Sequence, residues 1–156
     1  MTTTITPATL TITITESISL NGVDQGGTYA QTIASVTEVS RRIVNVPITE
    51  VTILAFQATT PGPGTFVEAD VRYIRITNLD NANHVTLVFR SEGSAEFAVK
   101  LDKGQSFIYN GDMSGGVVDT MDASASALTV SLEDLVDITA QADTAAVDLE
   151  IFVACC

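Results

Sequence analysis

The sequence has few of the residues from which enzyme sites are usually built. It contains one histidine, His84, no tryptophan, and only two cysteines, Cys155 and Cys156. No phosphate-binding glycine loop, CxxC pair or HExxH motif is present. A nucleophilic triad would have to use His84, and nothing in the sequence brings it near a cysteine. We therefore expect no catalytic residues, no bound cofactor and no enzyme activity.

The two cysteines are also too few and too close for a disulfide framework. They are adjacent in the chain, and the intervening peptide strains a bridge between neighbours. We interpret Cys155 and Cys156 as small apolar residues at the end of a strand, with a bridge between subunits or a reactive thiol as the alternatives. This cysteine usage fits synthesis in a reducing compartment.

Long apolar runs are missing as well. The longest apolar stretches, such as Val51 to Phe56, have the length of a strand, whereas a membrane helix needs about 18 residues or more. The N-terminus has no basic residue in front of an apolar core, so the sequence predicts neither a signal peptide nor a membrane segment.

Basic residues are absent from both ends of the chain. Residues 1–40 carry three acids and residues 104–156 carry nine, whereas all seven bases lie in residues 41–103 beside seven acids. The net charge of −12 repels phosphate groups, so we expect no nucleic-acid binding. The acids make the protein soluble, or they face a basic partner or divalent cations.

The sequence has a clear alternation of apolar and polar residues. Residues 9–20 place Leu10, Ile12 and Ile14 on one face and threonines on the other, a period of two that is typical of strands. Asn21-Gly22 then gives a strong hairpin signal. Nine or ten such segments, separated by short polar turns, predict an all-β fold, an antiparallel β-sandwich or jelly roll.

The domain organisation predicted from these segments is simple. Residues 1–8 are rich in threonine and contain Pro7, so they form an extended N-terminal arm, and residues 9–156 form a single sandwich domain. An arm of this kind can add a strand to the sheet edge of a neighbouring subunit. Thr3, Thr4, Ile5 and Pro7 are the candidate interface residues of the arm.

Two groups of charged residues are candidate binding sites. Asp112, Asp119 and Asp122 are weak candidates for a structural Ca²⁺ site, although their spacing is not that of an EF-hand. The competing interpretation is solvated loop acids. The basic residues concentrate at four arginines, which either balance nearby acids or dock on an acidic neighbouring subunit. These candidate interface residues are Arg41, Arg42, Arg72 and Arg75.

The segment from Val71 to Asn110 resembles a β module of structural proteins from tailed bacteriophages. It contains the tripeptide Ile76-Thr77-Asn78, a polar turn, a second strand from Val85 to Arg90, and the turn from Leu101 to Phe107. The resemblance covers about 40 residues, a quarter of the chain. It implies a virion component, such as a capsid decoration (cement) protein or a part of the neck or tail.

The functional hypothesis follows from this resemblance and from the lack of residues that usually form enzyme sites. We expect a non-enzymatic virion structural protein on the outer capsid surface, assembled in the host cytoplasm. Its partners would be the major capsid protein or other virion subunits, and a homo-oligomer, with a trimer favoured, would stabilise the shell by contacts between subunits. The alternatives are a neck, tail or fibre-associated protein and a carbohydrate-binding β-sandwich module, against which the few aromatic residues argue.

Overall fold

The computed structural model describes residues 4–60, 62, 64–111, 117–118 and 132–156. The chain divides into two compact units, Met1–Glu38 with Cys156, and Val39–Cys155. Each unit has its own sheets. Among the described residues, no helix is long and apolar enough to cross a membrane.

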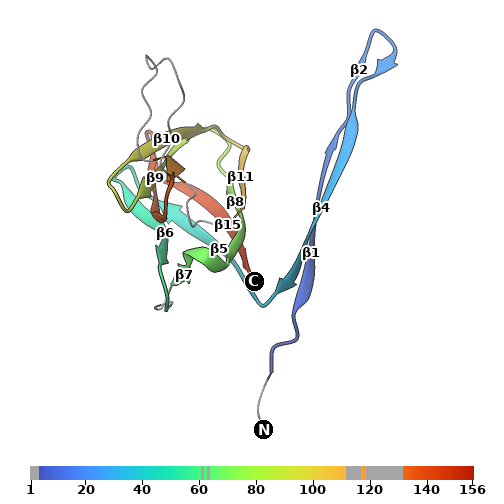
Figure 1. Ribbon diagram of the computed structural model, residues 1–156. Helices are drawn as coiled ribbons and strands as arrows, with labels where there is room; N and C mark the ends of the chain where they lie inside the picture. The colour runs from blue at the N-terminus through green and yellow to red at the C-terminus, as the bar shows by residue number, and fades with distance from the viewer. Residues whose placement is uncertain (1–3, 61, 63, 112–116, 119–131) are drawn as a thin grey trace, which may run out of the picture. The chain divides into compact units, whose positions relative to one another are not determined.

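The first unit is a two-stranded antiparallel ribbon (Figure 1). Strand β1 (Ala8–Glu16) pairs with β4 (Gly27–Val36) over nearly its whole length. The end of the ribbon is a small hairpin of β2 (Ser19–Leu20) and β3 (Val23–Asp24). Alternation of β-branched residues and threonine explains the long strands.

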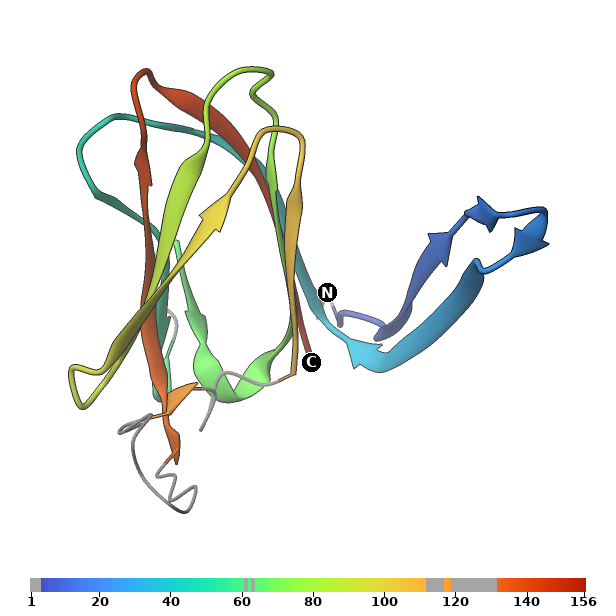
Figure 2. The ribbon, with the colours of Figure 1, turned by 90° about the horizontal axis from the view of Figure 1, so that it is seen from above.

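The second unit is a sandwich of two sheets, seen from above in Figure 2. The four-stranded sheet has the order β11-β8-β15-β5, and the five-stranded sheet has the order β10-β9-β14-β6-β7. The strands are β5 (Glu38–Val46), β6 (Val51–Gln57), β7 (Thr65–Val67), β8 (Val71–Asn78), β9 (Val85–Ser91), β10 (Glu96–Leu101), β11 (Ser106–Asn110), β14 (Leu135–Ala142) and β15 (Val147–Cys155).

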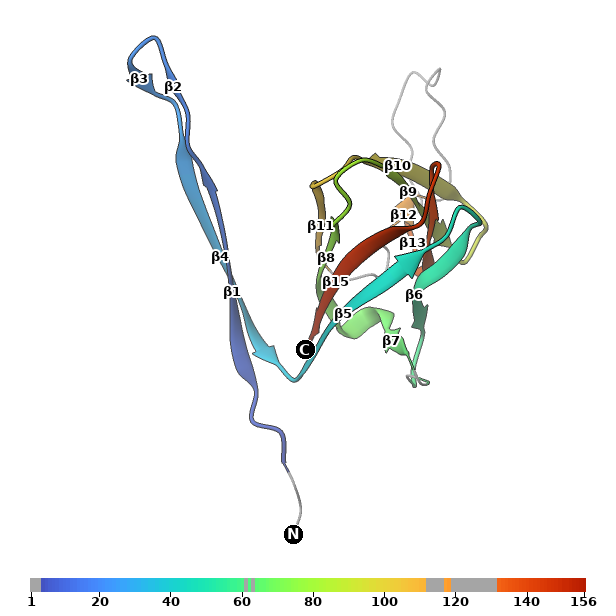
Figure 3. The same cartoon turned by 180° about the vertical axis from the view of Figure 1, so that it is seen from behind.

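The strand order is that of a jelly roll. The first strand of the unit, β5, lies beside the last, β15, and the next strand, β6, lies beside the second-last, β14. Strands β8 and β9 then pair with the far sides of β15 and β14. This nesting of early and late strands confirms the predicted all-β fold and selects the jelly roll among the predicted alternatives. Figure 3 shows the four-stranded sheet from behind.

The core lies between the two sheets. Alternate residues of the central strands are buried, for example Ile74 and Ile76 on β8 and Leu87 and Phe89 on β9. Phe89 stacks on Phe97 with ring centroids 4.6 Å apart. The buried cluster of apolar side chains begins at Val46 and runs to Cys155. Cys155 is buried in this cluster, which agrees with its interpretation as a small apolar residue at the end of a strand.

Three short elements complete the described part. The one-turn 3₁₀ helix η1 (Glu68–Asp70) leads into β8. Strands β12 (Val117–Val118) and β13 (Leu132–Glu133) pair with each other.

The predicted domain boundary needs a correction. We expected a short arm in residues 1–8 and one sandwich in residues 9–156. Instead, Ala8–Glu16 finds its partner in Gly27–Val36, and the two strands form a sheet of their own. The sandwich therefore begins near Glu38. Alternation predicts that a segment is a strand, but it does not predict which segment pairs with it.

Candidate assembly surfaces

The ribbon has one apolar face. Leu10 lies opposite Ile33, Ile12 opposite Gln31, and Ile14 opposite Tyr29, so these side chains share a face. Ile14 is 42% exposed and Tyr29 is 64% exposed. Two strands cannot cover such a face by themselves, because shielding it requires a further layer.

The opposite face of the ribbon is polar. Thr11 lies opposite Thr32 and Thr15 opposite Thr28, and all four are exposed. The hydroxyls of Thr28 and Thr15 lie 3.4 Å apart. The ribbon therefore has one apolar face and one polar face. This pattern is typical of a sheet that packs against another layer with its apolar face only.

The ribbon ends in a tight turn with apolar flanks. Asn21 and Gly22 both have positive φ, 52° and 78°, the conformation of a type I′ hairpin turn that the Asn-Gly pair predicts. Ile18, Leu20 and Val23 around it are each more than half exposed. The turn thus presents a small apolar tip to solvent.

The predicted arm residues precede β1. Thr4, Ile5 and Pro7 are exposed, with Ile5 66% exposed. Thr3 lies outside the described residues. Strand addition by this segment stays a prediction.

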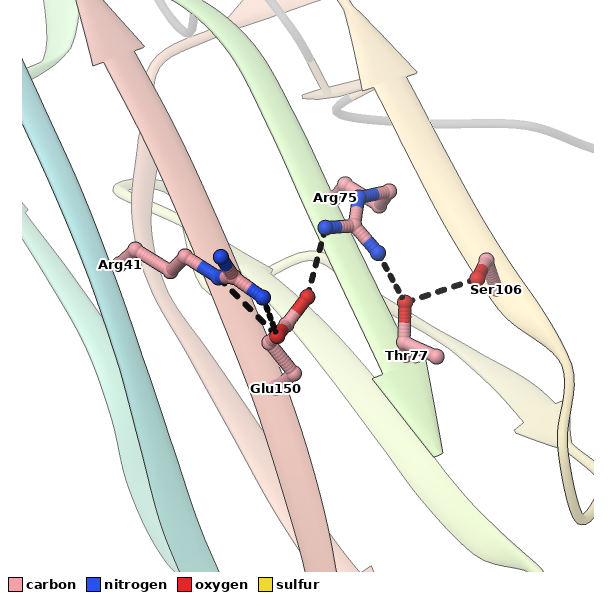
Figure 4. Close-up of polar contacts among 5 residues, drawn as sticks. All are labelled: Arg41, Arg75, Thr77, Ser106 and Glu150. Atoms are coloured by element: carbon pink, nitrogen blue, oxygen red, sulfur yellow. Dashed lines mark hydrogen bonds and ion pairs between the residues drawn. The ribbon is translucent and has the colours of Figure 1, made fainter. Parts of the chain in front are cut away.

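The structure brings two of the four candidate arginines together. Arg41 on β5 donates from Nε (3.0 Å) and Nη2 (2.5 Å) to Oε2 of Glu150 on β15. Arg75 on β8 donates from Nη2 to the other oxygen, Oε1, at 2.6 Å (Figure 4). One carboxylate between two guanidiniums leaves a local charge of +1 on a strongly acidic protein.

Hydrogen bonds extend this cluster across the whole sheet. Arg75 Nη1 donates to the Thr77 hydroxyl at 2.7 Å, and this oxygen lies 2.8 Å from the Ser106 hydroxyl on β11 (Figure 4). The hydrogen bonds from Arg41 and then Arg75 hold the pKa of the Glu150 carboxyl below its ordinary value. We call these five residues, Arg41, Arg75, Thr77, Ser106 and Glu150, the sheet-face cluster.

Apolar side chains surround the sheet-face cluster. Register places Ile108 and Phe152 on either side of Arg75, on the same face of the sheet. Ile43 follows Arg41 by two residues on β5 and shares its outward direction. Ile43 is 63% exposed and Ile108 is 39% exposed. The outer face of this sheet therefore combines apolar side chains with two arginines and two carboxylates, because Asp148 precedes Glu150 by two residues on β15 and accepts a hydrogen bond from Asn45 at 2.8 Å.

The other two candidate arginines do not join the cluster. Arg42 donates from Nη2 to the carbonyl oxygen of Ile53, and Arg72 donates from Nη1 to the carbonyl oxygens of Ala69 and Val71. Both side chains hydrogen-bond their own chain, so the predicted docking group of four arginines is divided in the structure.

A second charged group lies on the five-stranded sheet. Arg90 forms an ion pair with Glu50 and lies 3.8 Å from Glu96 and 3.9 Å from Asp137. Burial raises the pKa of Asp137, while Arg90 lowers it and Glu50 raises it further. Arg90 and Asp137 line a hollow of about 200 Å³, which is below the usual size of a ligand pocket.

The remaining candidate residues are His84 and the three aspartates predicted as weak Ca²⁺ ligands. The His84 ring lies 3.4 Å from the Asp143 carboxylate. Asp112, Asp119 and Asp122, the proposed Ca²⁺ ligands, lie outside the described residues. Within the described part, no group of three or more His, Cys, Asp or Glu residues could hold a metal ion.

The segment from Val71 to Asn110 is organised by one buried amide. Asn78 donates to the carbonyl oxygens of Asn83 (3.0 Å) and Leu101 (3.2 Å), and its side-chain oxygen accepts from the Asp80 amide at 2.9 Å. Its backbone also bonds Gln105 and Gly104. Sequence analysis noted Asn78 as a motif residue but missed this role, which depends on bringing two distant turns together.

No family model matches the chain, and no curated protein matches it. Among solved structures, the chain is similar to a subunit from the endospore appendages of Bacillus, described as a novel family of disulfide-linked pili, with 14% identity and a TM-score of 0.48. The alignment covers 76% of this chain and 82% of that chain. A likeness at this level carries no functional argument.

Proposed function

We propose that the chain is a non-enzymatic structural subunit of a virion, a capsid decoration protein that contacts its neighbours through the β1–β4 ribbon. The observation that carries the proposal is the exposed apolar face of this ribbon. A two-stranded ribbon is marginally stable in water, so a partner that covers the face stabilises both the ribbon and the assembly.

Burial of this face would contribute substantially to assembly. Fully burying an isoleucine, leucine or valine contributes about 1.5–3 kcal/mol, so covering side chains that are about half exposed contributes on the order of 1 kcal/mol each. Five such residues lie on the ribbon and its tip: Ile14, Ile18, Leu20, Val23 and Tyr29. Their sum offsets a substantial part of the entropy lost on association.

The choice of a virion among assemblies rests on the β module from Val71 to Asn110. The structure gives this module a physical basis, because Asn78 ties the turn after β8 to the turn before β11. A neck or tail subunit would use the same ribbon and module. Copy number in the particle separates the two, since a decoration protein is present in numbers comparable to the major shell protein.

Sedimentation velocity on matched ribbon variants tests the assembly role. Ile12→Thr with Ile14→Thr keeps the β-branched shape but removes the apolar face, and Thr11→Ser with Thr13→Ser is the control on the opposite face. We expect the wild type and the control to form oligomers and the isoleucine variant to stay monomeric. A wild type that is monomeric at every concentration would contradict the proposal.

A further inference from the structure

The charges of the ribbon restrict what can cover it. Residues 1–38 contain three acids, Glu16, Asp24 and Glu38, and no base. Glu16 lies on the apolar face of the ribbon, because it follows Ile14 by two residues on β1 and pairs with Gly27. The face therefore consists mainly of apolar side chains, with Gln31 among them and the Glu16 carboxylate at one end.

Two ribbons are poor partners for each other. Face-to-face packing of two copies would give the Glu16 carboxylates no basic partner, since neither ribbon carries a base. Like charges across an interface oppose association. The same argument excludes an anionic lipid surface or a nucleic acid as the occupant.

The outer face of the β11-β8-β15-β5 sheet has the complementary composition. It presents Ile43, Ile108 and Phe152 around the sheet-face cluster, in which two guanidiniums share one carboxylate, while the second carboxylate of the face, Asp148, is hydrogen-bonded to Asn45. The Arg41 side chain is 67% exposed although it already contacts Glu150. A carboxylate that approaches from outside would meet this guanidinium beside an exposed isoleucine.

The dimensions of the two surfaces also agree. Leu10 to Glu16 spans about 20 Å at 3.3 Å per residue, and four strands spaced about 4.8 Å apart are about 14 Å wide between the outer strand axes. A ribbon laid across the sheet would therefore contact all four strands. Its carboxylate end could lie at β5, where Arg41 is located.

We propose that the ribbon of one copy docks on the outer face of the four-stranded sheet of a second copy, with Glu16 facing Arg41. This inference rests on the proposed function and names the partner surface. Each copy donates a ribbon and accepts one, so two copies can exchange ribbons reciprocally as a closed dimer, or the contact can pass heterologously from copy to copy. Repetition closes into a ring, such as the expected trimer, or continues as an open chain.

A complementation experiment with full-length variants tests the proposal. The ribbon variant Ile12→Thr/Ile14→Thr retains an intact sheet face, and the face variant Arg41→Glu/Ile43→Thr retains an intact ribbon. We expect each to be monomeric alone by sedimentation velocity. A 1:1 mixture should form a dimer that grows no further, because only one of the two interfaces can form.

A charge exchange tests the named contact. We expect Glu16→Arg and Arg41→Glu each to weaken self-association roughly ten-fold or more, and the double variant in one chain to recover most of this loss. Lys103→Glu changes the charge equally at an exposed site away from this face and serves as the control. Ile43→Thr alone leaves the Glu150 ion pairs in place, so it separates loss of docking from loss of folding.

The outcomes distinguish the two proposals. If the wild type assembles and the ribbon variant does not, but the face variant assembles normally, the ribbon role stands and this docking surface is wrong. No dimer in the mixture, or no recovery by the charge exchange, would also overturn it. A wild type that never self-associates, including one whose ribbon folds onto its own sheet, would overturn this inference and the assembly role together.

Discussion

Asn78 shows how one buried polar residue can organise two turns. Its amide satisfies carbonyl oxygens of Asn83 and Leu101, and its oxygen accepts the Asp80 amide. The side chain is fully buried, and a buried carbonyl that loses its donor keeps its desolvation penalty. The Ile-Thr-Asn motif therefore requires asparagine because this residue supplies both donors and an acceptor.

Replacement of this residue should destabilise the sandwich. We expect Asn78→Ala to lower the free energy of unfolding by about 2–4 kcal/mol, since three side-chain hydrogen bonds are lost and two carbonyls lose a donor. Urea denaturation measures the change, and Asn81→Ala, at an exposed position in the same turn, is the control. Equal stability of the two variants would show that Asn78 does not hold the turns.

A buried carboxyl gives the sandwich a pH dependence. Glu68 is 8% exposed. Its burial is the main cause that raises its pKa above 4.5, and the Asp134 and Glu92 carboxylates raise the pKa further. The folded protein thus binds this proton more tightly than the unfolded chain does. The contribution of Glu68 to stability is full below pH 4.5 and is lost as pH rises from there through the raised pKa.

The variant Glu68→Gln has no carboxyl group to ionise at this position, so it should not lose this stability as the pH rises. We expect its melting temperature at pH 7 to exceed that of the wild type by a few degrees, with a smaller difference near pH 4. Differential scanning calorimetry across this range measures both values, and Asp70→Asn, an exposed neighbour, is the control. If the Glu68→Gln variant is instead less stable than the wild type at pH 7, the carboxylate form is favoured in the fold.

At the scale of elements, the ribbon depends on close backbone approach near its end. A Cβ on Gly26 would lie 2.3 Å from the carbonyl oxygen of Glu16, whereas a Cβ on Gly27 would meet nothing within 4 Å. The Gly26 amide also donates to the Asp24 side chain at 2.9 Å. A side chain would therefore clash with the backbone at Gly26 but would fit at Gly27. Packing requires glycine only at the first of these two positions.

This difference predicts opposite behaviour for two neighbouring variants. We expect Gly26→Ala to separate the strands near Glu16 and to accelerate amide exchange over β1, because the clash is with backbone. Gly27→Ala should leave the exchange rates close to those of the wild type. Hydrogen exchange read by NMR distinguishes them, and equal protection in both variants would contradict the described ribbon.

The elements themselves were largely predictable from the sequence, but their partners were not. Alternation in residues 9–20 predicts a strand, and Asn21-Gly22 predicts the turn that follows. The pairing of Ala8–Glu16 with Gly27–Val36 outside the sandwich has no local signal. Likewise, Arg41 and Glu150 are 109 residues apart, so their contact follows only from the β5–β15 pairing.

At the scale of the whole molecule, the two units differ in how much apolar interior they bury. The buried apolar cluster of the sandwich lies between Val46 and Cys155, and the buried Val36 of the ribbon unit is not part of it. The ribbon has little interior of its own. Under the proposed function, this division assigns stability to the jelly roll and contact with neighbours to the ribbon.

This division can be tested by removing the ribbon. We expect a chain without residues 1–36 to unfold cooperatively with a free energy within about 1 kcal/mol of the full chain, since the lost residues lie outside the core. The same chain should no longer self-associate. Circular dichroism with urea and light scattering check the two halves of the prediction, and a chain that cannot fold would show that the units are interdependent.

The central claim is membership of a large assembly, and sedimentation of a native lysate tests it most directly. The lysate of the cells that produce the protein is separated on a density gradient, and mass spectrometry locates this chain and counts it against the major shell protein. We predict that it sediments with a megadalton particle at a copy number comparable to that protein. If the chain instead stays at the top of the gradient as a monomer or small oligomer, the account of a virion subunit is wrong.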